Sequence, residues 1–181
     1  FQEKAPQYHI IAAGSLLGMS IHEGDSFPVG KVDFIDLYPM NFREFLRAIG
    51  ENQTADLLQK TIINDTPDFW AILHPLHEKL INYLRTYFYT GGMPEVIDYF
   101  RTQRDFEKVR SIQTKIVDSY RSDFSKHAPL DMLPRLNLVW NIIPQQLAKE
   151  NKKFIFSQIR KGARASEFEL AIEWLKQNGL I

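Results

Sequence analysis

The stretch Asn41-Phe-Arg-Glu-Phe-Leu-Arg-Ala-Ile-Gly50 marks the point at which the sequence becomes helical. Its apolar side chains recur at positions i, i+3, i+4 and i+7, which is the spacing of one face of an α-helix. Asn41 followed by Glu44 has the pattern of a capping box, and Gly50 is a typical helix stop. We therefore predict that a helical body begins here.

The same spacing, with proline and glycine at the helix ends, predicts further helices downstream. They cover residues 54–63, 74–90, 94–100, 106–124 and 133–151, with a kink expected at Pro144. A last helix should begin at Ser166, where Glu169 completes a second capping box. The run Gly91-Gly92-Met93-Pro94 is expected to form a tight joint between two helices.

Upstream of Asn41, the pattern favours strands. Tyr8 to Ala13 is a nearly continuous apolar run that ends in Gly14-Ser15, typical of a strand buried on both faces of a parallel sheet. Lys31 to Leu37 is a second strand candidate, and Phe154 to Phe156 is a brief third one. Near the C-terminal end, the order helix, short helix, helix and start of a strand indicates a winged helix without its wing. The predicted fold is mainly α within an α+β class: a remnant of a parallel α/β sheet, a helical region and a winged-helix-like segment.

The composition is that of an ordinary globular protein, with 181 residues, of which 44% are hydrophobic and 24% are charged. Its 22 basic and 22 acidic side chains cancel, which excludes a strongly basic coat but not a local basic patch. Cysteine is absent, so disulfides and Cys-based metal sites are excluded. No apolar run is long enough to cross a bilayer and no secretion signal is present. We expect a cytoplasmic protein with no membrane partner.

Two familiar kinds of chemical site fail on spacing. Gly24 to Lys31 has five intervening residues, and Val32 stands where a phosphate loop needs a hydroxyl. No apolar strand ends in Asp-Glu, so this chain alone should not assemble an ATP site. His74, His77 and Glu78 match no zinc motif, and no metal site is predicted.

A basic segment is the most distinctive chemical feature. Six basic side chains stand against Glu150 alone, a local charge of +5, with Phe154 and Phe156 interleaved. The helix that follows is acidic, which disfavours its entry into a DNA major groove. Two interpretations stay open: a solvated face or intramolecular contact, and a patch that binds nucleic-acid phosphates. The six candidate residues are Lys149, Lys152, Lys153, Arg160, Lys161 and Arg164.

Several strings, taken in order, resemble the prokaryotic AAA-type P-loop ATPases whose ATPase core is followed by a C-terminal domain of unknown function. They are Tyr8-His-Ile-Ile-Ala-Ala-Gly-Ser-Leu-Leu-Gly18, Ser26-Phe-Pro-Val-Gly-Lys-Val32, Leu37-Tyr-Pro-Met-Asn-Phe-Arg-Glu-Phe-Leu46, Tyr89-Thr-Gly-Gly-Met-Pro-Glu-Val96 and Ile143-Pro-Gln-Gln-Leu147. The resemblance implies an internal fragment whose Walker A and Walker B segments precede Phe1. Residues 1–40 would be the C-terminal edge of the ATPase core, residues 41–128 a helical region, and residues 129–181 the winged-helix-like region.

The resemblance also implies roles for individual residues. Ser15 would be the sensor 1 residue at the end of its strand, and Lys31 would contact phosphate where many relatives carry Arg. The full-length parent would bind ATP and Mg²⁺ and hydrolyse ATP, whereas this chain should need no cofactor. The alternative is a DNA-binding or protein-interaction module without catalysis. Residues 8–37 lack neighbouring strands, so we expect them to rearrange, to pair with another copy or to be poorly ordered.

Overall fold

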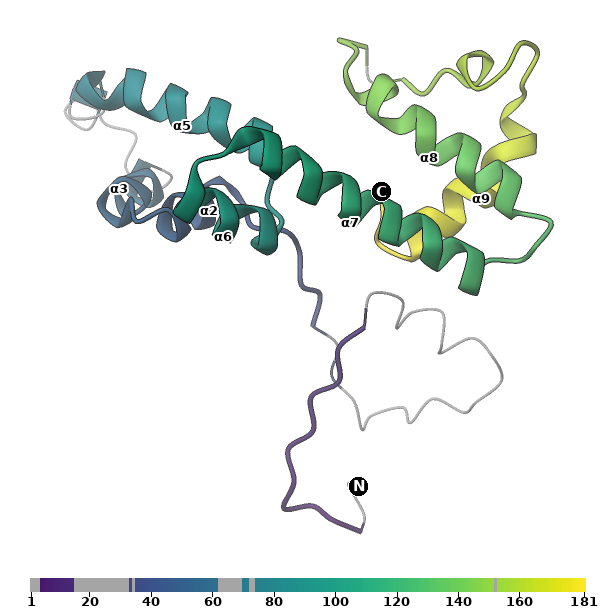
Figure 1. Ribbon diagram of the computed structural model, residues 1–181, viewed down its shortest axis with the longest axis horizontal. Coiled ribbons are helices and arrows are strands. Elements are labelled where there is room, and N and C mark those ends of the chain that lie inside the picture. Colours follow the sequence, from purple (N-terminus) through teal and green to yellow (C-terminus); the bar gives the residue numbers. More distant parts are fainter. Residues whose placement is uncertain (1–3, 15–32, 34, 62–69, 72–73, 152) are drawn as a thin grey trace. The chain divides into compact units, whose positions relative to one another are not determined.

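The computed structural model describes residues 4–14, 33, 35–61, 70–71, 74–151 and 153–181, and in this part every regular element is helical (Figure 1). The chain falls into two compact units, which we call the central unit (Asp36–Ser119) and the terminal unit (Phe1–Ile35 with Tyr120–Ile181). The elements are α2 Phe42–Ala48, α3 Asn52–Thr61, η1 His74–Leu76, α5 His77–Thr90, α6 Pro94–Gln103, α7 Phe106–His127, α8 Leu133–Leu147, η2 Phe156–Gln158 and α9 Ala165–Gln177, where η marks a 3₁₀ helix.

The predicted remnant of a parallel α/β sheet is wrong. Residues 8–13 and 35–37 are described without any strand pairing, and Ile11 is 96% exposed instead of buried. Residues 154 and 155 also form no strand, and η2 begins at Phe156. Without a strand among the described residues of 129–181, the winged-helix-like assignment is corrected as well. A strand exists only when a second backbone completes its hydrogen bonds, and local apolar sequence does not supply one.

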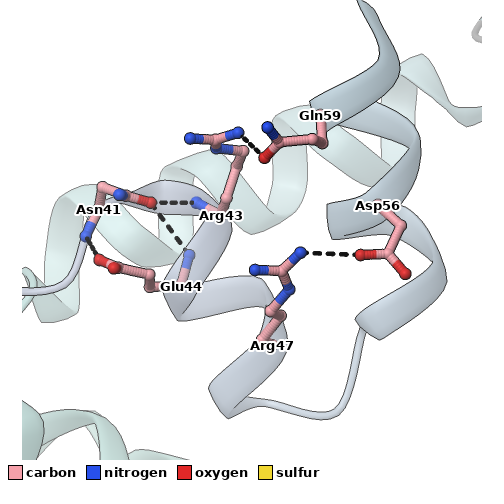
Figure 2. Close-up of polar contacts among 6 residues, drawn as sticks. All are labelled: Asn41, Arg43, Glu44, Arg47, Asp56 and Gln59. Carbon is pink, nitrogen blue, oxygen red and sulfur yellow. Dashed lines mark hydrogen bonds and ion pairs between the residues drawn. The ribbon is translucent and has the colours of Figure 1, made fainter.

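The start of α2 confirms the predicted capping box (Figure 2). The Asn41 side-chain oxygen accepts hydrogen bonds from the backbone N–H groups of Arg43 and Glu44, at 3.0 and 3.1 Å. In return, the Glu44 carboxylate accepts one from the Asn41 N–H at 2.8 Å. Three backbone N–H groups at the start of the helix, which would otherwise be unpaired, are thereby satisfied.

Helices α2 and α3 pack against each other in the central unit, and polar contacts lie along their shared edge (Figure 2). Arg47 forms an ion pair with Asp56 at 2.8 Å, and the Arg43 guanidinium donates to the Gln59 side-chain oxygen. The apolar faces of α2, α3 and α6 meet beneath this edge. The buried residues of this cluster are Phe45, Leu46, Ala55 and Ile97.

The Gly91–Pro94 run forms the tight helix–helix joint that the sequence predicts. Helix α5 ends at Gly91, whose φ of 70° is a left-handed conformation that favours glycine, and α6 begins with Pro94 in its first turn. Gln113 of α7 donates to the carbonyls of Tyr89 and Thr90, at 2.8 and 3.0 Å. Gln113, a polar residue of α7, therefore satisfies two carbonyls at the end of α5.

The terminal unit is built from the end of α7 with α8 and α9. Phe124 lies at the centre of its aromatic packing, with its ring edge-on to both Trp140 and Trp174, at centroid distances of 5.3 and 5.6 Å. Such edge-to-face pairs add to the free energy gained from burying the rings. The buried core residues are Phe124, Leu136, Val139, Phe168, Ala171, Trp174 and Leu175.

Candidate nucleic-acid interface

The segment between α8 and α9, residues 149–164, carries the cluster of basic residues that the sequence singles out. We call it the basic segment. Apart from η2 it has no regular structure in its described residues, and Lys152 lies outside them. Ser15 and Lys31, the other two predicted site residues, also lie outside the described residues. The site is therefore assembled from Lys149, Lys153 and the residues from 160 to 164.

The side chain of Gln146 holds the middle of the basic segment. Its oxygen accepts the N–H of Ile155 at 3.1 Å, and its amide nitrogen donates to the Ile155 carbonyl and to the Gln158 side-chain oxygen, both at 3.1 Å. Gln146 is buried, so these bonds avoid the cost of leaving a buried amide without partners. The Gln146 side chain thus satisfies both the N–H and the carbonyl of Ile155, as the backbone of a neighbouring strand would.

Apolar contacts with the core of the terminal unit also hold the basic segment. Phe156 and Ile159 pack against the core of the terminal unit, and the Phe154 ring meets the Phe156 ring edge-on at 4.9 Å. The backbone of the basic segment is therefore held at its middle by the core and by Gln146. Its cationic side chains extend from this anchored backbone.

Three lysines of the segment face no carboxylate among the described residues. The Lys149 ammonium donates to the side-chain oxygens of Gln146, at 3.3 Å, and Gln158. Both partners are neutral amides, so the charge of Lys149 is not cancelled. Lys153 and Lys161 are exposed, and their side chains form no ion pair or hydrogen bond within the described part of the chain.

Glu167 in the first turn of α9 contacts both arginines, Arg160 through its side chain and Arg164 through its backbone N–H. Arg160 forms an ion pair with Glu167, and the other Glu167 oxygen accepts the Arg164 N–H at 3.1 Å. The hydrogen bond from Arg160, with that from the Arg164 backbone, lowers the pKa of Glu167. Arg164 is the N-cap of α9, which begins at Ala165, and Glu167 is the third helical residue, so the predicted Ser166–Glu169 box is wrong.

Sequence reasoning missed a second polar cluster, at Glu51 in the central unit. One Glu51 oxygen accepts from Lys79 at 2.9 Å and from Thr54 at 3.0 Å, and the other accepts from the Tyr83 hydroxyl at 2.5 Å. The Lys79 and Tyr83 hydrogen bonds lower the pKa of Glu51 to about 2. Only the i, i+4 spacing of Lys79 and Tyr83 hints at this cluster in the sequence.

An open hollow of about 590 Å³ lies beside Glu51, whose carboxylate already accepts hydrogen bonds from the protein. The hollow is lined by residues 50–54, Leu57, Leu76 and Lys79. Both carboxylate oxygens of Glu51 already accept hydrogen bonds from the protein, and the Lys79 ammonium offsets its charge. The cluster thus fastens the α2–α3 connection to α5.

Other kinds of site are not found in the described part of the chain. No group of three His, Cys, Asp or Glu side chains there is arranged to hold a metal ion. No helix in the described ranges combines the length and the apolar character that crossing a bilayer requires.

Comparison with known proteins gives one match. Residues 81–181, more than half of the chain, match a family described as a domain of unknown function (DUF8612). No curated protein and no solved structure matches the chain. Together with the absence of strands among the described residues, this match makes the resemblance to AAA-type P-loop ATPases wrong. The ATP, Mg²⁺ and sensor assignments that followed from that resemblance lose their basis.

Proposed function

Since the chain belongs to the DUF8612 family, a domain whose function is unknown, we propose a function from its own surface: a non-catalytic module whose basic segment binds the phosphates of duplex DNA. The observation that carries this proposal is a set of lysines that pair with no carboxylate among the described residues: Lys149, Lys153 and Lys161. Cations held on an anchored backbone and not neutralised by the protein attract a polyanion.

The surroundings of the segment favour contact with phosphates over reading of bases. Helix α9, which follows it, exposes Glu169 and Glu173, and carboxylates entering a major groove would be repelled by the DNA backbone. Phosphate contacts orient a protein on DNA and carry no sequence information of their own. Binding should therefore be weak, similar for unrelated duplexes and strongly dependent on salt.

For Arg160 the structure favours the other interpretation, an intramolecular contact. Its charge is offset by Glu167 in the free protein. The expected binding surface is thus centred on the lysines, with Arg160 joining only when its ion pair opens. If the segment binds phosphates, the lysines should contribute more to binding than Arg160 does. A uniformly solvated face would show no such difference.

A labelled duplex titrated with the whole chain tests the proposal by fluorescence anisotropy across a salt series. In the variant Lys153→Ala/Lys161→Ala, the plot of log K against log salt should be shallower by about two units, because each phosphate contact contributes about 0.9. The matched control is Lys108→Ala/Lys115→Ala, which removes two exposed lysines of α7 and should leave the slope unchanged.

Two outcomes would overturn this function. The first is the absence of any duplex binding by the unaltered chain at ~50 mM salt, which would favour a protein partner for the basic segment. The second is binding that both double variants weaken equally, because that would place the contact outside the segment. A stable far-ultraviolet circular dichroism spectrum in every variant ensures that the helices are retained.

A further inference from the structure

Aromatic rings and an arginine come together where the end of α5 meets the start of α7 in the central unit. The Tyr89 and Phe106 rings lie edge-to-face at a centroid distance of 4.9 Å, and the Tyr89 hydroxyl donates to the Phe106 carbonyl at 3.2 Å. The Arg110 guanidinium lies over the Tyr89 ring, 5.7 Å from its centroid. These contacts hold two rings and one cation in a single cluster.

Helical spacing adds two residues of α5 to this cluster. Arg85, Phe88 and Tyr89 stand at positions i, i+3 and i+4, so they share one face of the helix. Phe88 is 75% exposed, and Phe106 and Tyr89 are 44% and 39% exposed. Neighbouring exposed rings, unlike single exposed side chains, indicate a binding surface. We call these five residues the aromatic patch: Arg85, Phe88, Tyr89, Phe106 and Arg110.

The two arginines of the aromatic patch keep their charge. Arg85 donates to the Asn82 side-chain oxygen at 3.4 Å, and Arg110 donates to that of Gln113 at 3.1 Å. Both acceptors are neutral amides, and neither arginine forms an ion pair within the described part of the chain. Their guanidinium groups are therefore open to an anionic ligand.

The sequence around the start of α7 is also positive. Residues 101–115 carry five basic side chains against the two carboxylates of Asp105 and Glu107. One Asp105 oxygen accepts the backbone N–H groups of Glu107 and Lys108, at 2.9 and 3.1 Å, and so stabilises the start of α7. Exposed rings among excess positive charge match an anionic ligand that has flat rings of its own.

A single strand of nucleic acid combines these two properties. Its phosphates pair with arginine, and its unpaired bases stack on aromatic side chains and on guanidinium planes. An acidic peptide would supply the charge but no regular series of rings. A duplex keeps its bases stacked inside, so it offers ring faces only at its ends.

We propose that the aromatic patch binds single-stranded nucleic acid. Bases stack on its exposed rings, chiefly on Phe88, and Arg85 and Arg110 contact the phosphates between them. The patch lies in the central unit and the basic segment in the terminal unit, so this site does not rest on duplex binding by the basic segment.

A labelled oligothymidine strand of about twelve nucleotides, titrated with the whole chain and followed by anisotropy, tests the stacking. Phe88→Leu keeps an apolar side chain but removes the ring, and affinity should fall about fivefold or more, the contribution of one stacked base. Phe88→Trp restores a ring and should bind as tightly as the unaltered chain, and the strand should quench its added indole fluorescence. Because Phe88 is mostly exposed, the helical circular dichroism of both variants should be unchanged.

The phosphate contacts are tested by a salt series with the same strand. Arg85→Gln/Arg110→Gln should reduce the slope of log K against log salt by about 1.4, since each single-strand phosphate contact contributes about 0.7. The matched control is Arg135→Gln/Lys176→Gln, which removes two exposed cations of α8 and α9 and should leave the slope unchanged.

The variant Lys153→Ala/Lys161→Ala separates this site from the basic segment. Adding Phe88→Leu to it should weaken strand binding by the same factor as in the unaltered chain. The proposal is overturned if the unaltered chain does not bind the strand at ~50 mM salt, or if Phe88→Leu binds as tightly as Phe88→Trp. It is also overturned if the arginine variant and its control weaken binding equally.

Discussion

The backbone N–H of Met40 donates a hydrogen bond to the Gly92 carbonyl at 2.8 Å, and a Cβ atom on Gly92 would lie 2.3 Å from the Met40 carbonyl oxygen. That same Met40 oxygen accepts the Tyr87 hydroxyl at 2.8 Å. The chain entering α2 thus lies directly against the joint between α5 and α6. Only glycine leaves room for this contact, which ties three helices of the central unit together.

Replacing Gly92 with alanine should destabilise the central unit by about 2 kcal/mol, because the clash involves backbone atoms that have little freedom to move. Urea unfolding followed by circular dichroism measures the loss. The control is Gly50→Ala, where a Cβ would meet nothing within 4 Å but φ is 92°. Backbone strain alone should cost about 1 kcal/mol there. A Gly92 variant as stable as the Gly50 variant would contradict the close contact.

Replacing Glu51 with glutamine should change how stability depends on pH. The folded pKa of about 2 lies below the ordinary 4.5, so the carboxylate stabilises the fold fully above about pH 4.5. That stabilisation is lost as the pH falls from about 4.5 towards 2. The variant should lose about 2 kcal/mol at pH 7, as expected for hydrogen bonds to a charged group, and its stability should vary less across this window.

The control for this prediction is Glu78→Gln, which removes an exposed carboxylate in the first turn of α5. Its pH dependence between 4.5 and 2 should follow that of the unaltered chain. Unfolding free energies from urea titrations at several pH values would decide. Parallel curves for the Glu51 variant and the unaltered chain would show that the cluster does not act as a fastening.

The starts of α2 and α6 were predictable from sequence because their signals are local. Asn41 with Glu44 lies within one helical turn, and Pro94 acts at its own position, so both are confirmed where the sequence placed them. The predicted strand at residues 8–13 failed for the opposite reason. A strand requires a partner backbone that no property of its own residues guarantees.

The candidate site was predictable only in its composition. The cluster of cations is visible in the sequence, but the pairing of Arg160 with Glu167 depends on how the chain turns into α9. Glu167 also accepts the Arg164 N–H, so the capping carboxylate lies two positions before Glu169, where the sequence predicted it. Lys79 and Tyr83 lie 28 and 32 positions from Glu51, so no local pattern in the sequence connects them to it.

Replacing Gln146 with methionine should loosen the basic segment. Methionine keeps a similar shape but leaves the N–H and carbonyl of Ile155 without partners, at a cost of about 2 kcal/mol. The Ile155 amide should exchange with solvent faster in a hydrogen-exchange experiment, and duplex affinity should fall because the lysines lose their anchored backbone. Gln145→Met, at the exposed neighbouring position, should change neither quantity. Unchanged exchange at Ile155 would contradict the anchoring role of Gln146.

Replacing Glu167 with glutamine should strengthen DNA binding, in contrast to the lysine variants. Glutamine keeps an oxygen that can accept the Arg164 N–H and so preserves the start of α9, but it releases the Arg160 guanidinium from its ion pair. One further phosphate contact should raise affinity about tenfold at ~50 mM salt and steepen the salt dependence by about one unit. Anisotropy titrations of the same duplex measure both quantities. Glu169→Gln makes the same charge change on α9 without an ion pair to open, and should leave the slope as it is. Equal effects of the two variants would show that Arg160 does not join the interface.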